Sequence, residues 1–302
     1  MERLKNQSKL NNGEYYVKVN GIKHWYKIAG AEKETTPIVI IHGGPGGHNY
    51  VFERTPGPKI EEFSTVIYYE QRGCGRSDAP KNQGEYSIPI LISDLAEFCK
   101  KLNIDKIIPL GFSFGGELAL EFALSHPELV ERVIAQAPSM FSYNQRVSST
   151  QVYGFQQVSE GDIKKKINDI VKLDINIDEK CSKIWEIVDL KTVDRLLFHN
   201  GKYGEFMRNL WQESKLVNTG LMMEALLKQQ YKGLLTDRLP KIKAPVLIMT
   251  GLYDRNVGLN LNRDMASKIS DCKFVIFDKS AHFPDIEESE KYANEVKKFI
   301  LE

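Results

Sequence analysis

The sequence predicts an α/β fold in which a mostly parallel central sheet is flanked by helices and interrupted by a helical insertion. Strand and helix patterns alternate over residues 87–138 and again over 244–302, and repeated βαβ units build parallel sheets with helices on both faces. Between about residues 138 and 240 this alternation gives way to amphipathic helical stretches. A chain of 302 residues is long enough to bury a core without disulfides or metals.

The N-terminal quarter predicts strands, because its segments either alternate in polarity or are rich in β-branched apolar residues. Asn20 and Gly21 separate the first two strands and accept positive φ angles, so these strands are expected to form a hairpin. The strands of this quarter are expected at 15–19, 23–29, 37–44 and 64–73.

The later elements follow from hydrophobic spacing, from short buried apolar runs and from the proline at position 127. They are expected as a helix at 87–103, a strand at 106–111, a helix from 115 that stops before Pro127, a strand at 130–138, a strand at 244–254, a helix at 259–269, a strand at 273–278 and a closing helix at 289–302. We therefore expect a core domain formed by residues 1–138 and 240–302, with residues 139–239 inserted as a helical cap, or lid.

The charge balance argues against a polyanionic partner. There are 41 Lys and Arg residues against 40 Asp and Glu, which gives a formal net charge of +1 and no basic field for nucleic acid or an anionic membrane. A small molecule or a short peptide is the expected partner, and the composition leaves the oligomeric state open.

The cysteines and the N-terminus suggest a reducing compartment. Cys74, Cys99, Cys181 and Cys272 are scattered without metal-ligand spacing, which is typical of packing residues. The first residues lack the apolar region of a signal peptide, and no run approaches the ~18 apolar residues of a membrane span. A soluble cytoplasmic protein is expected.

The segment GFSFGG (111–116) lies between a predicted strand and a predicted helix. This is the context that the nucleophile-elbow pattern G-x-S-x-G requires. Ser113 is read either as a nucleophile at the carboxyl edge of the sheet or as a serine that caps the helix. The residues that follow the later strands favour the first interpretation.

Asp254 and His282 follow consecutive C-terminal strands, so both are expected at the same sheet edge as Ser113. The chain order Ser, acid, His is that of a hydrolase triad. The alternative interpretation, taking each residue alone, is that Asp254 forms a turn and His282 is a loop histidine. The other five histidines fit a general base less well, by their places in the sequence: His24, His42, His48, His126 and His199.

A glycine-rich turn, HGGPGG (42–47), follows the third predicted strand. Acyl transfer needs two preorganised donors for an oxyanion, and the N–H groups of Gly44 and Phe114 are the candidates. The Phe114 ring is a further candidate for an apolar wall of the site. The alternative is a simple Gly-Pro-Gly loop.

The segment YEQRGCGRS (69–77) is read either as an active cluster of Glu70, Arg72 and Ser77 or, preferably, as a charged turn held by its own hydrogen bonds. Arg72 and Arg76 are expected to lower the pKa of the Cys74 thiol. Since no histidine lies nearby in the sequence, Cys74 is interpreted as structural.

The motifs HGGPGG, EQRGCGRS, GFSFGG, GLYD and AHFP, in this order, resemble the α/β-hydrolase superfamily and, more narrowly, the proline iminopeptidase branch of serine peptidases. The resemblance covers residues 15–138 and 240–302. It implies an α/β-hydrolase fold and a serine hydrolase without metal or organic cofactor, acting through an acyl-enzyme on a peptide or amide with a small N-terminal residue, proline above all. It assigns Ser113 as nucleophile, His282 as base, Asp254 as acid, and Gly44 and Phe114 as the oxyanion hole.

The sequence also departs from that branch. Glu70 stands where the family commonly has Asp, and Phe114 where it often has Trp or Tyr. Family members hold the substrate's amino group with cap glutamates; the candidates here are Glu186, Glu213 and Glu224, each of which can also be a solvated helix face. Two other functions stay open: a cap-bearing esterase, lactonase or amidase, and a receptor-like or catalytically dead binding protein.

Overall fold

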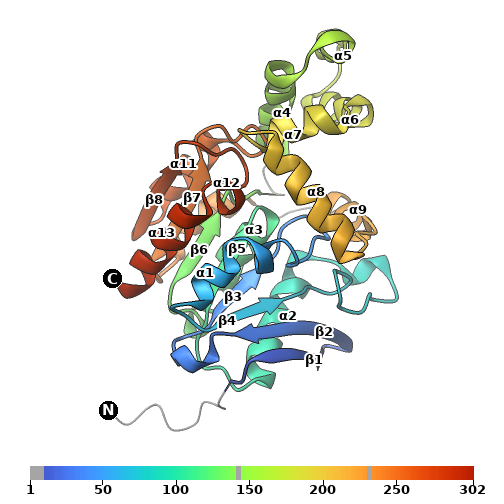
Figure 1. Cartoon of the computed structure of the whole chain (residues 1–302). Helices are drawn as coiled ribbons and strands as arrows, with labels where there is room; N and C mark the ends of the chain where they lie inside the picture. The colour runs from blue at the N-terminus through green and yellow to red at the C-terminus, as the bar shows by residue number, and fades with distance from the viewer. Residues whose placement is uncertain (1–9, 141–143, 230–232) are drawn as a thin grey trace.

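The computed structural model describes residues 10–140, 144–229 and 233–302. Within these ranges, one eight-stranded sheet has the order β1-β2-β4-β3-β5-β6-β7-β8 (Figure 1). The neighbours from β4 to β8 are parallel, while β1–β2 and β2–β4 are antiparallel. The strands are β1 Gly13–Val19, β2 Ile22–Ala29, β3 Ile38–Ile41, β4 Val66–Tyr69, β5 Ile108–Phe112, β6 Val133–Gln136, β7 Val246–Gly251 and β8 Cys272–Phe277. The mostly parallel sheet predicted from the sequence is confirmed.

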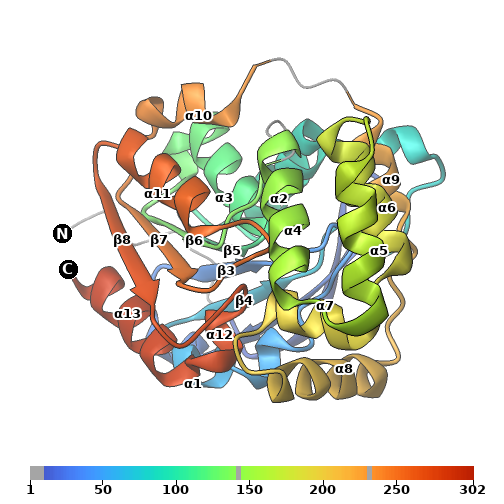
Figure 2. The same cartoon turned by 90° about the horizontal axis from the view of Figure 1, so that it is seen from above.

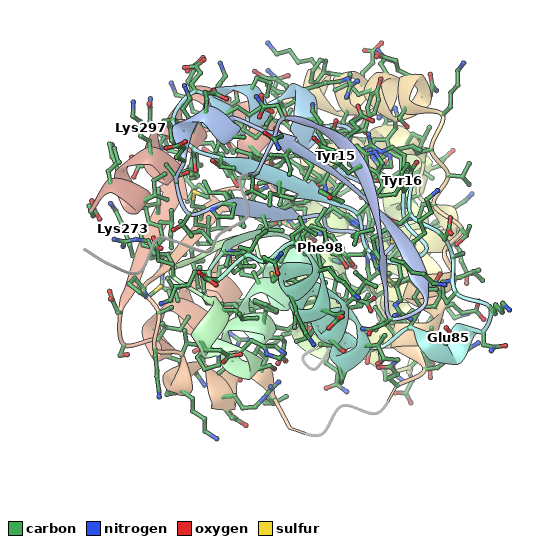
Figure 3. The ribbon with its side chains drawn as sticks, turned by 90° about the horizontal axis from the view of Figure 1, so that it is seen from below. Tyr15, Tyr16, Glu85, Phe98, Lys273 and Lys297 are labelled. Carbon is green, nitrogen blue, oxygen red and sulfur yellow. The ribbon has the colours of Figure 1, made fainter. Side chains whose placement is uncertain are left out.

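The N-terminal hairpin also forms as predicted. Asn20 and Gly21 have φ angles of 46° and 86°, and Val19 pairs with Ile22 across the turn. On β1, neighbouring side chains take opposite faces: the Tyr15 ring stacks on Tyr26 at 5.3 Å, while Tyr16 is exposed (Figure 3). This alternation is the period of two by which the strand is recognised in the sequence.

Helices cover both faces of the sheet (Figure 2). On one face lie α2 (Ile88–Lys101), α3 (Phe114–Ser125) and α11 (Leu259–Lys268), and on the other lie α1 (Gly57–Glu61) and α13 (Ser289–Leu301). The Ser87 hydroxyl caps α2 by accepting the Ile90 N–H at 3.3 Å. Phe98, on the buried face of α2, packs edge-on against Tyr26 beneath the sheet (Figure 3). Two apolar cores result, one on each side of the sheet.

Several strands end earlier than the sequence predicts, and two of them lead into the motif loops. β3 stops at Ile41 and β4 at Tyr69, so HGGPGG and EQRGCGRS leave the sheet as loops. Their backbone groups are bonded within the loops and to polar side chains, for instance Asn49 Nδ2 to the Tyr69 carbonyl at 2.9 Å. The short helix α1, which has no sequence signal beyond Pro58 at its start, was not predicted.

The segment between β6 and β7 is mainly helical where it is described, and most of it lies above one end of the sheet (Figures 1 and 2). A small apolar core of its own joins α4, α5, α6 and α7 through residues such as Phe155, Ile167 and Ile184. Its helices are α4 Asn144–Val158, α5 Gly161–Lys172, α6 Ile177–Ile187, α7 Leu190–Leu197, α8 Lys202–Ser214, α9 Leu221–Leu227 and α10 Leu235–Arg238. The boundaries of a separate cap at 139–239 stay a prediction.

The expectation about the N-terminal leader falls on residues 1–9, which lie outside the described part of the chain. Among the described helices, none combines the length and apolar character needed to cross a membrane.

Candidate active site

Ser113 lies on a strained turn between β5 and α3. Its φ and ψ angles are 55° and −121°, a conformation that non-glycine residues adopt rarely and at a cost of roughly 1–3 kcal/mol. Its backbone N–H donates to the Gln136 carbonyl at 2.8 Å, and its carbonyl accepts from the Gly116 N–H at 2.9 Å. The side chain does not cap α3, so the helix-capping interpretation is wrong.

Glycines make this turn possible. A Cβ atom on Gly111 would lie 1.9 Å from the Gly115 carbonyl oxygen, and one on Gly115 would lie 2.0 Å from the carbonyl oxygen of Ile41. Such contacts are far inside van der Waals distance, so the strand, the helix and β3 approach this closely only without side chains. The elbow therefore depends on both glycines of the pattern.

Asp254 and His282 form a buried pair. Nδ1 of His282 lies 3.1 Å from Oδ2 of Asp254, and Oδ1 of Asp254 accepts the N–H groups of Asn256 and Val257 at 2.8 and 3.0 Å. Burial opposes ionisation, but His282 and these N–H groups hold the pKa of Asp254 below its usual value. A Cβ on Gly251 would lie 1.9 Å from the Ala281 carbonyl oxygen, so glycine again permits the approach of the two loops.

Ser113 and His282 line one pocket with a volume of about 710 Å³. Its floor comes from the core, including Phe52, Phe112 and Ile286, and its roof comes from α4, α6, α7, α8 and α9. Most of the lining is apolar, as in sites that bind small ligands. A larger, more open hollow of about 1270 Å³ beside α2 contains neither Ser113, Asp254 nor His282.

The glycine-rich turn lies against the elbow. Gly43, Gly44 and Pro45 line the pocket, and a Cβ on Gly43 would lie 3.0 Å from the Cβ of Ser113. Phe114 follows Ser113 directly as the first residue of α3. Phe114 is thus adjacent to the serine in sequence and Gly44 lines the same pocket. The role of their N–H groups as oxyanion donors stays a prediction.

The Phe114 ring does not form a wall of the pocket. Phe114 is fully buried and packs in the core formed with α2 and α11. Phe112, the last residue of β5, lines the pocket instead. The aromatic wall beside the serine therefore comes from the residue before it.

The loop that contains EQRGCGRS is a charged turn held by hydrogen bonds within it and by an ion pair to α2. Arg76 Nε donates to the Glu70 carboxylate at 3.1 Å, and the Ser77 hydroxyl donates to the Glu70 carbonyl at 2.7 Å. Arg72 forms a two-pronged pair with Asp94 at 2.6 and 2.7 Å. None of these side chains is among the described residues that line the pocket.

The Cys74 thiol is less acidic than the sequence predicts. Burial and the nearby Glu70 raise the pKa of this thiol well above its usual value, because the arginines beside it in sequence are paired with carboxylates instead. The thiol is buried, and all four cysteines are free. Its structural interpretation fits this environment.

Two histidines near the glycine-rich turn are held neutral. Burial lowers the pKa of His42 to about 4 and that of His48 to about 3. His42 bonds to backbone groups of Gly43 and Gln71, as a turn residue does. His48 lines the pocket, with its ring centroid 3.9 Å from that of Trp211, a placement that its loop position in the sequence does not reveal.

The predicted cap glutamates are not brought to the pocket. Glu186 is exposed, Glu213 accepts the Tyr50 hydroxyl at 2.7 Å, and Glu224 pairs with Lys228. None belongs to the lining that the described residues form. The placement favours the solvated-face interpretation for all three.

Two aspartates supply the carboxylates of the pocket lining instead. Asp178 lies in the first turn of α6, and Asp285 lies in α12 (Pro284–Glu287). Burial raises the pKa of Asp285 to about 7, although Gln136 opposes the shift. Asp285 could have been found from the sequence, because it lies only three residues after His282. No sequence signal points to Asp178 as a residue of the pocket.

A metal centre has no ready ligand set in the described structure. Over residues 10–140, 144–229 and 233–302, no cluster of three or more His, Cys, Asp or Glu side chains has the arrangement of a metal site.

A serine on a strand-to-helix elbow, in a pocket lined also by the histidine of a buried Asp–His pair, is the arrangement of an α/β hydrolase. The family model described as alpha/beta hydrolase fold matches residues 36–289, and the chain belongs to this family. Within it, the chain is similar to curated proteins named proline iminopeptidase. The one from Saccharolobus solfataricus is 28% identical, over 96% of this chain and 93% of its own; that from Clostridioides difficile is 29% identical, over 92% and 94%.

A solved structure gives the same fold. The proline iminopeptidase-related protein of Thermus thermophilus superposes with a TM-score of 0.78 at 20% identity, covering 96% of this chain and 97% of that one. The predicted resemblance and the predicted α/β-hydrolase fold are therefore confirmed.

Proposed function

We propose that the protein is a serine aminopeptidase of the proline iminopeptidase type, which releases a small apolar N-terminal residue, proline above all, from short peptides or amides. Its similarity to proline iminopeptidases extends over nearly its whole length. The observation that carries the proposal is the pocket, which combines Ser113 and His282 with a partly buried carboxylate, Asp178, from α6.

The proposed chemistry proceeds through an acyl-enzyme. Nε2 of His282 takes the Ser113 proton while Oγ attacks the substrate carbonyl, and the protonated imidazole then delivers that proton to the leaving amine. Asp254 orients His282 and stabilises its charged form. The N–H groups of Gly44 and Phe114 bind the oxyanion, at about 3 kcal/mol of transition-state stabilisation each. Water then releases the acid by the same route.

Asp178 is the proposed anchor for the substrate's ammonium group. Its Oδ1 atom is buried and has no hydrogen-bond partner among the described residues, although a buried carboxylate oxygen without a donor is costly. A substrate ammonium would supply the missing donors and the opposite charge. Asp285 is the poorer anchor, because its carboxylate already accepts the Gln136 amide at 2.6 Å.

The helical segment 139–239 is proposed to act as a cap that limits substrate length. Side chains from α4, α6, α8 and α9 line the pocket that contains Ser113, among them Gln151, Trp185 and Trp211. We propose that this cap leaves room for one N-terminal residue beyond the ammonium site. Apolar walls such as Phe52 and Phe112 suit a proline ring better than a charged side chain.

A substrate panel tests the function. We expect prolyl p-nitroanilide to be hydrolysed faster than other aminoacyl anilides, and a fluorophosphonate to label the wild type but not Ser113→Ala. If p-nitrophenyl esters are hydrolysed while every aminoacyl anilide is inert, the protein is an esterase-like hydrolase. Absence of labelling in the wild type would instead identify a binding protein.

A further inference from the structure

The base of the proposed site has a second side-chain partner. Nε2 of His282, the atom that must take the serine proton, lies 3.2 Å from Nδ2 of Asn256. Asn256 also donates its backbone N–H to Asp254, so one residue contacts both members of the Asp–His pair. Its side chain continues toward the helical segment that covers the pocket.

The orientation of this contact follows from a tryptophan on α6. The indole N–H of Trp185 can only donate, and it lies 2.8 Å from Oε1 of Gln151 on α4. The Cys181 thiol donates to the same oxygen at 3.2 Å. Two donors at one atom identify it as the amide oxygen, so the amide nitrogen of Gln151 must face the other way.

The nitrogen of the Gln151 amide determines the orientation of the Asn256 amide. Nε2 of Gln151 donates to Oδ1 of Asn256 at 2.8 Å, which leaves Nδ2 of Asn256 facing His282. An amide NH₂ group is only a donor, so Nε2 of His282 must be the unprotonated acceptor. The ring proton then lies on Nδ1 and is donated to Asp254 at 3.1 Å. The chain of contacts selects the tautomer that a general base requires.

We propose that Asn256, oriented by Gln151 and Trp185, is a positioning residue that holds His282 in its neutral, proton-accepting form and couples that form to the helices covering the pocket. This inference rests on the proposed function, because His282 is its base. Once Nε2 is protonated, two donors face each other and the Asn256 contact is lost. The contact therefore stabilises the neutral imidazole alone. Because Nε2 has one lone pair, Asn256 must release it when Ser113 donates its proton.

The other groups that face His282 cannot replace this contact. Asp254 bonds Nδ1 rather than Nε2, and both Asp254 and Asp285 favour the charged ring through their negative charge. Glu287 accepts the Ala281 N–H at 2.7 Å, and Ser113 is uncharged. Within the described residues, Asn256 is the partner whose hydrogen bond opposes protonation.

The test is the pH dependence of the second-order rate at which a fluorophosphonate labels Ser113. The acid limb of this profile reports protonation of the base in the free enzyme. Loss of one hydrogen bond of about 1 kcal/mol should move the limb of Asn256→Leu up by about 0.7 pH units. Gln151→Leu should move it in the same direction, since the Asn256 amide is then free to turn its oxygen toward His282.

We call the chain of contacts from Trp185 through Gln151 and Asn256 to His282 the relay. If it acts as one chain, the shifts caused by the two substitutions are not additive. The double variant should shift no further than Asn256→Leu alone, because both changes interrupt one chain. The matched control is Gln156→Leu, which removes a similar amide pair on α4, with Asn168 at 3.1 Å, and should leave the limb in place. Because Asp285 titrates near pH 7, the series is repeated in Asp285→Asn. The proposal would be overturned if the acid limb of Asn256→Leu does not move. It would also be overturned if the shifts of Asn256→Leu and Gln151→Leu add in the double variant.

Failure of the proposed function gives a different result. If Ser113 is labelled but no aminoacyl anilide is hydrolysed, the substrate assignment fails while the relay is still measured by the labelling profile. If Ser113 is not labelled at all, NMR titration of the His282 ring in wild type and Asn256→Leu measures the same shift without activity. Equal titration curves for the two proteins would then contradict the relay.

Discussion

Nε2 of Gln136 donates a hydrogen bond of 2.6 Å to Oδ1 of Asp285 at the wall of the pocket. Gln136 ends β6 and its carbonyl accepts the backbone N–H of Ser113, so the contact links the buried carboxyl to the elbow. This single amide donor does not offset burial, which raises the pKa of Asp285 to about 7. The carboxyl is therefore a source of pH-dependent stability.

Asp285→Asn should stabilise the protein at alkaline pH. A carboxyl with a raised pKa holds a proton in the folded state that the unfolded chain releases, so stability falls as pH rises from about 4 to 7. Removing the charge should increase the free energy of unfolding, relative to wild type, by up to about 4 kcal/mol more at pH 8 than at pH 4. Urea unfolding at both pH values measures this. The control, exposed Asp162→Asn, should show no such gain, and an Asp285→Asn difference independent of pH would contradict the burial argument.

Ser113→Gly should be inactive and more stable than wild type. Glycine adopts the φ of 55° without the strain of a side chain, which should raise the free energy of unfolding by about 1 kcal/mol. Ser113→Ala, equally inactive, keeps the Cβ atom and the strain. Thermal unfolding of Ser113→Gly and Ser113→Ala separates the effect of losing the hydroxyl from the effect of relieving backbone strain. Equal unfolding midpoints for the two variants would show that the elbow stores no strain.

Gly111→Ala should destabilise the fold strongly. Its Cβ would meet backbone atoms of Gly115 at 1.9 Å, and displacing β5 from α3 should cost at least about 3 kcal/mol. Gly201→Ala is the matched control, since no atom lies within 4 Å of the added Cβ; its unfolding free energy should change by less than about 0.5 kcal/mol. A folded Gly111→Ala protein of wild-type stability would be incompatible with the close approach described.

Asp254→Asn should leave binding nearly intact and reduce kcat by about 10³–10⁴-fold, because an amide no longer fixes the His282 tautomer or stabilises its charged form. Steady-state kinetics with the best anilide substrate measures kcat and KM separately. A loss confined to KM would assign Asp254 to substrate binding rather than to orientation of the base.

Much of the fold follows from local patterns. The βαβ periodicity predicts the order of β5, α3, β6, β7, α11, β8 and α13, and Asn20-Gly21 predicts the hairpin. Gly111 is required by a neighbour close in sequence, Gly115, whereas Gly115 is required by the distant Ile41 carbonyl. Asp254 and His282 were located because strand ends meet at one sheet edge.

The pocket wall required the three-dimensional packing. Amphipathic helices show which residues are polar but not which polar residue turns inward, and so Asp178 was missed while three exposed glutamates were named. Phe112 and Phe114 flank the same serine, yet one ends a strand at the pocket and the other begins a helix in the core. The pKa of the Cys74 thiol was misjudged because burial, which the sequence does not show, raises it, and because Arg72 and Arg76 pair with carboxylates.

We propose that Asp178 binds an N-terminal ammonium group in the pocket that Ser113 lines. The deciding measurement is kcat/KM for prolyl p-nitroanilide and for its N-acetylated form, in wild type and Asp178→Asn. We predict that acetylation lowers wild-type kcat/KM by about 100-fold, and that Asp178→Asn loses about the same factor on the free amine, through KM, because each change removes one charged hydrogen-bonded pair. Equal kcat/KM of the wild type for the two anilides would contradict the binding of an ammonium group by Asp178.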